Sequence, residues 1–118
     1  METMDLSKAQ IAETYLDAYR SKDPAKALLA TNVSLQYPLT PKKVVGRDNV
    51  VQYMLSVMPG FDGVELERHL IDGDYVTTLW TAVTVWGRIP ACSVFRVSEG
   101  SIAEVRSYFD PRPILQRQ

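Results

Sequence analysis

The sequence is poor in the residues that build disulfides and metal sites. Its 118 residues include one cysteine, Cys92, and one histidine, His69. A single cysteine cannot form an intrachain disulfide, and one cysteine with one histidine does not supply the ligands of a zinc site. The acidic residues show no spacing typical of a metal site. We therefore expect no metal and no cofactor, and we interpret Cys92 as a small residue of the core or of an interface.

Long apolar runs and an excess of charge are also missing. No apolar segment reaches about 20 residues, the length that spans a membrane as a helix, and residues 1–10 lack the apolar centre of a signal peptide. The lysines and arginines number 13 and the acids 14, which gives a net charge of -1. Nucleic-acid binders usually carry a basic patch. We expect a cytoplasmic protein with no membrane partner and no nucleic-acid partner.

The length and composition fit one globular domain. Hydrophobic residues make up 46% of the chain, an ordinary share for a folded protein. A chain of this length has room for one hydrophobic core and not for two. We expect a single domain over residues 1–118.

The first half of the sequence predicts three helices and one strand. Ser7 and Gln10 form a capping box, and apolar residues then follow at helical spacing as far as Tyr19. An aspartate–proline pair at 23–24 predicts a short helix over residues 24–30. Residues 33–39 alternate as a strand does, with a proline near its end that favours an edge position. A third helix is expected between the Gly-Arg-Asp at 46–48 and the Pro-Gly at 59–60.

The second half predicts four consecutive strands. They are rich in β-branched and aromatic residues, and short turn signals with glycine separate them. The expected strands are 64–71, 75–86, 89–97 and 101–109. Four strands in a meander with helices on one face make α+β the expected fold class.

The last hairpin carries a family resemblance. Residues 94–110 read VFRVSEGSIAEVRSYFD, and residues 45–48 before the third helix read VGRD. These segments resemble the SnoaL-like and limonene-epoxide-hydrolase-like branch of the NTF2-like superfamily, to which ketosteroid isomerases are also related. The resemblance implies a cone: a curved antiparallel sheet wrapped around three N-terminal helices, with a small apolar molecule inside. It also implies a homodimer through the outer sheet face, where Leu79, Val83 and Val85 would lie.

Turn lengths predict which strand residues enter the cone, because side chains alternate between the two faces of a sheet. A two-residue turn at 87–88 pairs Trp86 with Ile89 and places Trp86, Thr84 and Trp80 on one face. A three-residue loop at 98–100 makes Ser93 and Ser107 face the same space. A two-residue turn at 72–73 puts His69 on that face too, whereas a three-residue turn puts it on the other.

The resemblance allows the catalytic residues of two known mechanisms to be compared with this sequence. Ketosteroid isomerases use a tyrosine, a neutral aspartate and a second carboxylate. Tyr15 matches the tyrosine, but the two acids would fall near Ser93 and Tyr37. Limonene epoxide hydrolases use an Asp-Arg-Asp group, and its last acid would fall on Ser107. Residues 79–84 offer neither of the other two, and a serine lacks the basicity of a carboxylate at neutral pH.

These observations favour a cofactor-independent enzyme that moves a proton in an apolar metabolite such as a polyketide or terpenoid, as an isomerase or cyclase. Three alternatives stay open: a binding protein without chemistry, an epoxide hydrolase with a different active site, and a structural or interaction protein that uses the exposed sheet face. The aromatic candidates also fit plain core packing. The expected catalytic residues are Tyr15, His69 and Asp110, and the expected substrate-binding residues are Tyr37, Trp80, Thr84, Trp86, Ser93, Ser107 and Phe109.

Overall fold

The structure, a computed structural model, describes residues 6–39 and 42–115. Its elements, in chain order, are α1 (Lys8–Ser21), the 3-10 helix η1 (Pro24–Lys26), β1 (Leu29–Gln36), β2 (Val44–Val45), α2 (Arg47–Val57), the 3-10 helix η2 (Met58–Gly60), β3 (Phe61–Asp72), β4 (Tyr75–Thr84), β5 (Gly87–Ser98), β6 (Ser101–Phe109) and α3 (Arg112–Leu115). The expected α+β class is confirmed. Among the described residues, no helix is long and apolar enough to cross a membrane.

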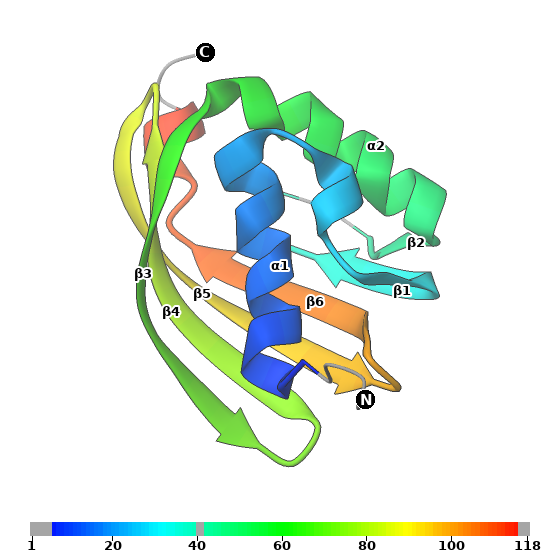
Figure 1. Cartoon of the computed structure of the whole chain (residues 1–118). Helices are drawn as coiled ribbons and strands as arrows, with labels where there is room; N and C mark the ends of the chain where they lie inside the picture. The colour runs from blue at the N-terminus through cyan, green and yellow to red at the C-terminus, as the bar shows by residue number, and fades with distance from the viewer. Residues whose placement is uncertain (1–5, 40–41, 116–118) are drawn as a thin grey trace.

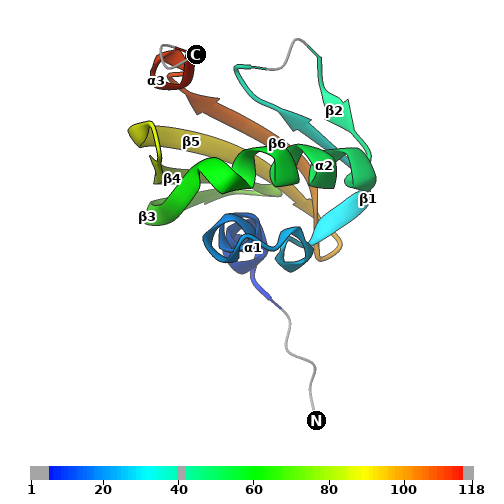
Figure 2. The same cartoon turned by 90° about the horizontal axis from the view of Figure 1, so that it is seen from above.

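One curved sheet wraps around the helices (Figures 1 and 2). Its strand order is β2-β1-β6-β5-β4-β3. The last four strands form the predicted antiparallel meander, and β1 lies parallel to β6. Helix α1 lies in the hollow of the sheet and α2 lies beside it, so the sheet and the helices enclose the interior of a cone (Figure 1).

Helix α1 begins with the predicted capping box. The Ser7 hydroxyl accepts from the Gln10 backbone N–H at 3.1 Å, and the Ser7 N–H donates to the Gln10 side chain at 2.8 Å. The buried face includes Ile11, Leu16 and Tyr19, at the expected spacing. Burying such side chains contributes about 1.5–3 kcal/mol each, so tertiary packing holds this helix more than its caps do.

Two predictions about the first half are wrong in extent. The helix expected over 24–30 is a single 3-10 turn, because the chain already joins the sheet at Leu29, opposite Ile102 of β6. The first strand ends at Gln36 instead of continuing past the proline at 38. The short elements β2 and α3 were not predicted, since neither is long enough to show a periodic pattern.

The β4–β5 turn also differs from the prediction. Thr84 pairs with Gly87, so Val85 and Trp86 form the turn, two residues earlier than expected. The Thr84 hydroxyl holds it by donating to the Gly87 carbonyl at 2.7 Å and accepting from the Trp86 N–H at 3.1 Å. A shift of two residues keeps the same side chains on the inner face. Trp80 therefore lies inside the cone as predicted.

The β5–β6 hairpin has a two-residue turn, not the expected three-residue loop. Its residues Glu99 and Gly100 have φ angles of 52° and 80°, as a tight turn of this hand requires. The register then shifts between Arg96 and Val97, because β6 carries one extra residue there, Ala103, between the partners Ile102 and Glu104. This bulge brings Ser93 opposite Ser107, so both face the interior.

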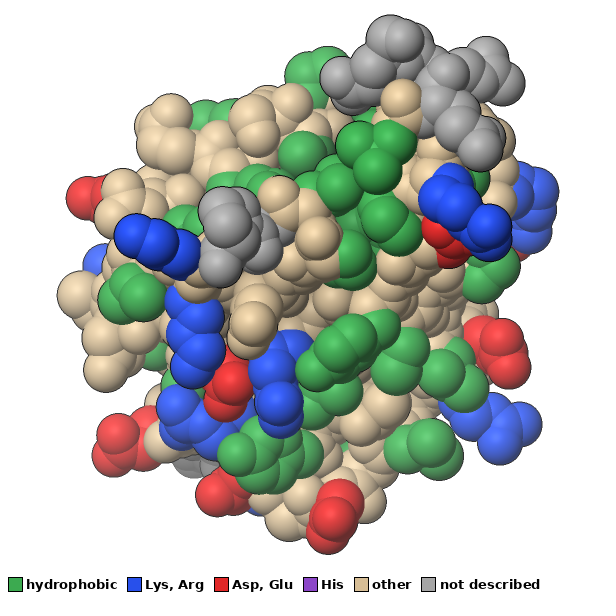
Figure 3. All heavy atoms as spheres, turned by 180° about the vertical axis from the view of Figure 1, so that it is seen from behind, with side chains coloured by type: hydrophobic (Ala, Val, Ile, Leu, Met, Phe, Trp, Pro, Cys, Tyr) green, Lys and Arg blue, Asp and Glu red, His purple; other side chains and the backbone are tan. Residues whose placement is uncertain are grey.

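The outer face of the sheet mixes apolar and charged side chains (Figure 3). Leu79, Cys92 and Tyr108 stand side by side on three strands, and Tyr108 is 53% exposed. Ion pairs flank them: Arg88 with Glu65, and Glu104 with two arginines. Cys92 thus lies on the outer face and not in the core.

Candidate functional site

A cavity of about 440 Å³ lies inside the cone, at the end where α2, η2 and the β4–β5 turn meet. This is the upper end of the molecule in Figure 1. Its walls come from the helices α1, α2 and α3 and from the sheet. The lining residues are Tyr15, Tyr19, Tyr37, Leu39, Tyr53, Ser56, Val57, Pro59, Gly60, Phe61, Trp80, Ala82, Thr84, Val85, Trp86, Ile89, Ala91, Ser107, Phe109 and Ile114.

The cavity wall carries aromatic rings and hydroxyls but no charge. None of the described lining residues is an acid, a base or a histidine. Over the described part of the chain, no group of three or more His, Cys, Asp or Glu is placed to hold a metal ion. The polar chemistry available to a bound molecule therefore comes from neutral donors and acceptors.

Four tyrosines supply most of these hydroxyls, and we call them the tyrosine group. On α1, the hydroxyls of Tyr15 and Tyr19 lie 3.0 Å apart, and their rings meet edge to face at 5.2 Å. Tyr37 follows β1 and Tyr53 lies on α2; their side chains are hydrogen-bonded and their ring centres are 4.3 Å apart. The Tyr15–Tyr19 pair shares one hydrogen bond, which leaves a second hydroxyl hydrogen of that pair to donate elsewhere.

The surroundings keep the tyrosine group protonated. Burial raises the pKa of the Tyr15, Tyr19 and Tyr53 hydroxyls well above the ordinary value, because a phenolate there would lose its water. Burial also raises the pKa of Tyr37, although less of that side chain is enclosed. At neutral pH these groups therefore act as hydrogen-bond donors and acceptors and not as bases.

The inner face of the sheet changes character from one cross-strand row to the next. The row of Val76, Phe95 and Val105 is apolar and fully buried. The next row along consists of Thr78, Ser93 and Ser107, which we call the hydroxyl row. The following row begins with Trp80 and ends with Phe109, and both line the cavity.

Two serines of the hydroxyl row are linked to the cavity wall. The Ser93 and Ser107 hydroxyls lie 2.8 Å apart, and the Trp80 indole N–H donates to the Ser93 hydroxyl at 3.0 Å. Ser107 lines the cavity, whereas Ser93 lies behind it and is fully buried. The sequence analysis predicts that both serine side chains face the same space, and in the structure both lie on the inner face of the sheet.

Trp86 closes the cavity from the β4–β5 turn. Its ring lies against Gly60, where a Cβ atom would come within 2.7 Å of the ring. The turn itself is tied to the same segment, because the Val85 N–H donates to the Gly60 carbonyl at 2.9 Å. A glycine at this position is what allows the indole to form the wall.

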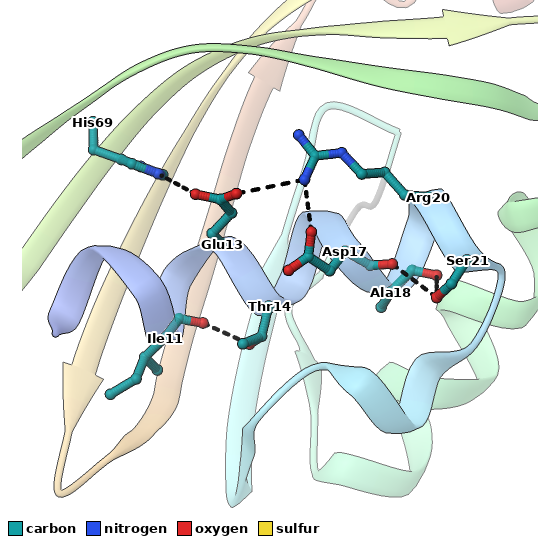
Figure 4. A network of polar contacts seen from close by, with 8 residues as sticks. All are labelled: Ile11, Glu13, Thr14, Asp17, Ala18, Arg20, Ser21 and His69. Carbon is teal, nitrogen blue, oxygen red and sulfur yellow. Dashed lines mark hydrogen bonds and ion pairs between the residues drawn. The ribbon is translucent and has the colours of Figure 1, made fainter. Parts of the chain in front are cut away.

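His69 lies outside the cavity. It does share the inner face with Trp80, but the two-residue turn is formed by residues 73–74 instead of 72–73, so His69 pairs with Thr78. Figure 4 shows its ring directed from β3 toward Glu13 of α1, and the two side chains are 3.1 Å apart. The other ring nitrogen lies 2.8 Å from the Thr78 hydroxyl. Because both nitrogens contact protein groups away from the cavity, we do not retain a catalytic role for His69.

Asp110 also lies outside the cavity. Its carboxylate accepts from the Arg112 backbone N–H at 3.0 Å and from the Arg112 guanidinium at 2.7 Å and 2.9 Å. These hydrogen bonds lower the pKa of the Asp110 carboxyl, which makes it a poorer base. It therefore belongs to the turn before α3, and we do not retain it as a catalytic residue either.

The other predicted residues come together. Tyr15, Tyr37, Trp80, Thr84, Trp86, Ser107 and Phe109 all line the cavity, with Ser93 behind them. Sequence reasoning missed Tyr19, Tyr53 and Phe61 as lining residues. Tyr19 was assigned to the core stripe of α1, and Tyr53 lies one residue before the buried Met54. On α2, Tyr53 and Val57 lie four residues apart, and this helical spacing is the signal that would have found Tyr53.

Comparisons with known proteins agree with this architecture. The sequence model of the SnoaL-like domain matches residues 12–105, so the chain belongs to the SnoaL-like domain family and has the NTF2-like fold. A comparison with curated proteins finds no match.

Solved structures of the same fold include proteins from several bacteria. An NTF2-like protein of unknown function from Cytophaga hutchinsonii has a TM-score of 0.83 at 19% identity, over 98% of this chain and 99% of its own. A proposed SnoaL-like polyketide cyclase from Jannaschia sp. has a TM-score of 0.79 at 14% identity, over 97% and 96%. A proposed ketosteroid isomerase from Kribbella flavida has a TM-score of 0.76 at 22% identity, over 87% and 77%. At these identities the likeness shows the fold alone.

Proposed function

We propose that this chain binds a small, mostly apolar ring compound that carries at least one oxygen, inside the cavity at the α2 end of the cone. The observation that carries this proposal is the uncharged wall: aromatic rings and buried hydroxyls surround a volume of about 440 Å³. Pockets for small molecules commonly measure about 300–1,000 Å³ and combine an apolar wall with a few polar groups.

The wall chemistry defines the class of ligand. Apolar surface gains about 25 cal/mol per Å² when it leaves water, and the rings of Phe61, Trp80 and Trp86 offer such surface. A charged ligand would lose its hydration without finding an opposite charge in the described lining. A carbonyl or hydroxyl oxygen would instead find the tyrosine group or Ser107.

The two tryptophans of the chain make binding easy to measure. Both line the cavity, so their fluorescence reports its occupancy. We expect fluorene and 9-fluorenone to change this emission saturably. Ala82→Phe, which fills the cavity from β4, should weaken binding at least about tenfold, the loss that about 1.4 kcal/mol of contact produces. Thr81→Phe, the neighbour on the outer face, is the matched control, and equal binding by the two variants would refute the proposal.

A second candidate function is an isomerase or cyclase step that begins by polarising a carbonyl. The observation that favours it is the tyrosine group, because hydroxyls that stay protonated can donate to a developing enolate oxygen in a dry site. The described lining residues offer no carboxylate or imidazole to take the proton, so water or the substrate itself would take it. Family membership is compatible with such chemistry.

Hydrogen–deuterium exchange separates catalysis from binding. The probe is 2-tetralone in D₂O, whose protons next to the carbonyl exchange through its enolate, followed by NMR. We expect the protein to speed this exchange above the buffer rate if it polarises the carbonyl, and Tyr15→Phe to reduce the rate. Exchange at the buffer rate with the ketone bound would leave binding as the function.

We further propose that two copies pair through the outer sheet face. The apolar side chains of Leu79 and Cys92, together with the exposed Tyr108 ring, support this assembly. Light scattering on the eluting protein should give a dimer mass, and Leu79→Lys should give a monomer. Glu99→Lys, in the distant β5–β6 turn, is the control; a monomeric parent chain would rule the assembly out.

A further inference from the structure

The hydroxyls of Ser93 and Ser107, the two serines of the hydroxyl row, have fixed donor and acceptor roles. Ser93 is fully buried, so its hydrogen must be donated within the protein. Among the hydrogen bonds of the described residues, its hydroxyl has two partners, the Trp80 indole N–H and the Ser107 hydroxyl. An indole N–H can only donate. The only acceptor within these bonds for the Ser93 hydrogen is therefore the Ser107 oxygen.

This assignment leaves the Ser107 hydrogen without a protein acceptor. Within the described part of the chain, the Ser107 hydroxyl bonds to Ser93 alone, and the residue lines the cavity. The reverse direction, Ser107 donating to Ser93, would strand a buried hydrogen on Ser93, which folded proteins avoid. The chain of bonds thus runs one way, from Trp80 through Ser93 to Ser107 and into the cavity.

We infer that Ser107 is a one-way donor site, selecting ligands with a hydrogen-bond acceptor oxygen, such as a ketone, quinone or lactone carbonyl, at this point of the cavity. The Tyr15–Tyr19 pair differs, because either hydroxyl can be the donor in its shared hydrogen bond, so that pair can serve a ligand donor or a ligand acceptor. Successive hydrogen bonds also polarise one another, which strengthens the donor at Ser107. This inference rests on the proposed binding function and narrows its ligand class.

Three tricyclic probes of nearly the same shape test the direction. At the same bridging position, 9-fluorenone has an acceptor carbonyl, carbazole has a donor N–H, and fluorene has neither. We expect the unmodified protein to bind 9-fluorenone about tenfold more tightly than fluorene, the size of one good hydrogen bond. Ser107→Ala should remove this advantage and leave the carbazole-to-fluorene ratio unchanged. Ser107→Thr, which keeps the hydroxyl, should retain the advantage.

An infrared measurement gives an independent readout. The carbonyl stretch of bound 9-fluorenone should lie at lower frequency than in an apolar solvent, and Ser107→Ala should reverse that shift. Circular dichroism checks that each variant folds. If Ser107→Ala does not fold, the infrared shift is compared between Ser107→Thr, which keeps the hydroxyl, and the unmodified protein.

The outcomes distinguish failure of this inference from failure of the binding proposal. If 9-fluorenone keeps its advantage in Ser107→Ala but loses it in Tyr37→Phe, the tyrosine group holds the oxygen and the inference is overturned while binding stands. If Ser107→Ala weakens carbazole as much as 9-fluorenone, the hydroxyl is not one-way. If none of the three probes binds the unmodified protein, both proposals fail.

Discussion

The two ends of the cone are built on the same strands, but one end is closely packed and the other encloses a cavity. At the end near the β3–β4 turn, the inner face presents Val76, Phe95 and Val105, which pack with no measurable exposure. Four residues along β4 from Val76, the face presents Trp80, and the space beside it stays open. The difference shows that the fold alone does not make a cavity. The side chains at successive positions of the same strands decide whether the interior is filled or open.

The hydroxyl row forms the boundary between these ends. A buried polar row has to satisfy its hydrogen bonds sideways, along the sheet, and it does so through Ser93 and Ser107 and through Thr78 and His69. Apolar packing therefore stops at this row. Phe95 reaches it from the packed end, with its ring 5.6 Å from that of Tyr15 on the cavity side.

The largest expected effect compares one phenylalanine from each end. Phe95→Ala should lower the free energy of unfolding by about 3–5 kcal/mol, because the packed end leaves a void that cannot collapse. Phe109→Ala should cost about 1–2 kcal/mol, since that ring is half-buried beside space that is already open. Urea unfolding measures both. Equal losses would mean that the two ends are packed alike.

Alkaline pH should weaken the cavity end next. Burial raises the pKa of Tyr15, Tyr19 and Tyr53 above the ordinary 10.0. Below about pH 10 these hydroxyls are protonated whether the chain is folded or not; above it the unfolded chain releases their protons first. Stability then falls by about 1.4 kcal/mol per pH unit for each such group until the folded pKa is reached.

The test of this pH dependence uses a matched pair of variants. Unfolding free energies measured between about pH 9 and 11 should fall less steeply for Tyr19→Phe than for the unmodified protein. Tyr75→Phe, at an exposed ring at the start of β4, should keep the original slope. If Tyr19→Phe also keeps that slope, the buried hydroxyls do not govern the alkaline behaviour.

A smaller effect is expected where η2 meets the β4–β5 turn. Gly60→Ala places a methyl group against the Trp86 ring. The ring must then move into the cavity or away from it, and either movement should weaken 9-fluorenone binding by about tenfold, or about 1.4 kcal/mol. Gly63→Ala, whose Cβ would lie 3.8 Å from Val83, is the control. Unchanged binding and tryptophan emission in Gly60→Ala would show that Trp86 does not form the wall.

Much of this architecture follows from patterns in the sequence. The capping box at Ser7, the stripe on α1 and the four-strand meander need only local periodicity and turn residues. The pairing of Ser93 with Ser107 does not. A two-residue turn at 99–100 alone would set Ser93 opposite Arg106, and only the extra residue Ala103 in β6 brings Ser107 opposite Ser93. No residue type in this segment signals such a bulge. The prediction that Ser93 and Ser107 share the inner face was therefore correct, although the three-residue loop on which it depended was wrong.

The partner of His69 could not be predicted from the sequence for another reason: Glu13 reaches His69 across the space between α1 and β3, 56 residues away in the chain. Asp110 differs, because its partner Arg112 is two residues away and a carboxylate before a proline is typical of a turn. Trp86 was predicted to face the interior from a strand, yet it does so from a turn, because Thr84 fixes that turn with its hydroxyl.

The smallest effect is expected at His69, which belongs to the same cross-strand row as Ser107 but points away from the cavity. His69→Gln replaces a contact with the partly exposed Glu13 and can still hydrogen-bond Thr78. Because one such hydrogen bond contributes about 1 kcal/mol, the free energy of unfolding should fall by no more than that. Binding of 9-fluorenone and exchange of 2-tetralone should stay unchanged, in contrast to Ser107→Ala. A large fall in either would show that the hydroxyl row transmits changes from α1 to the cavity, and would return His69 to the functional site.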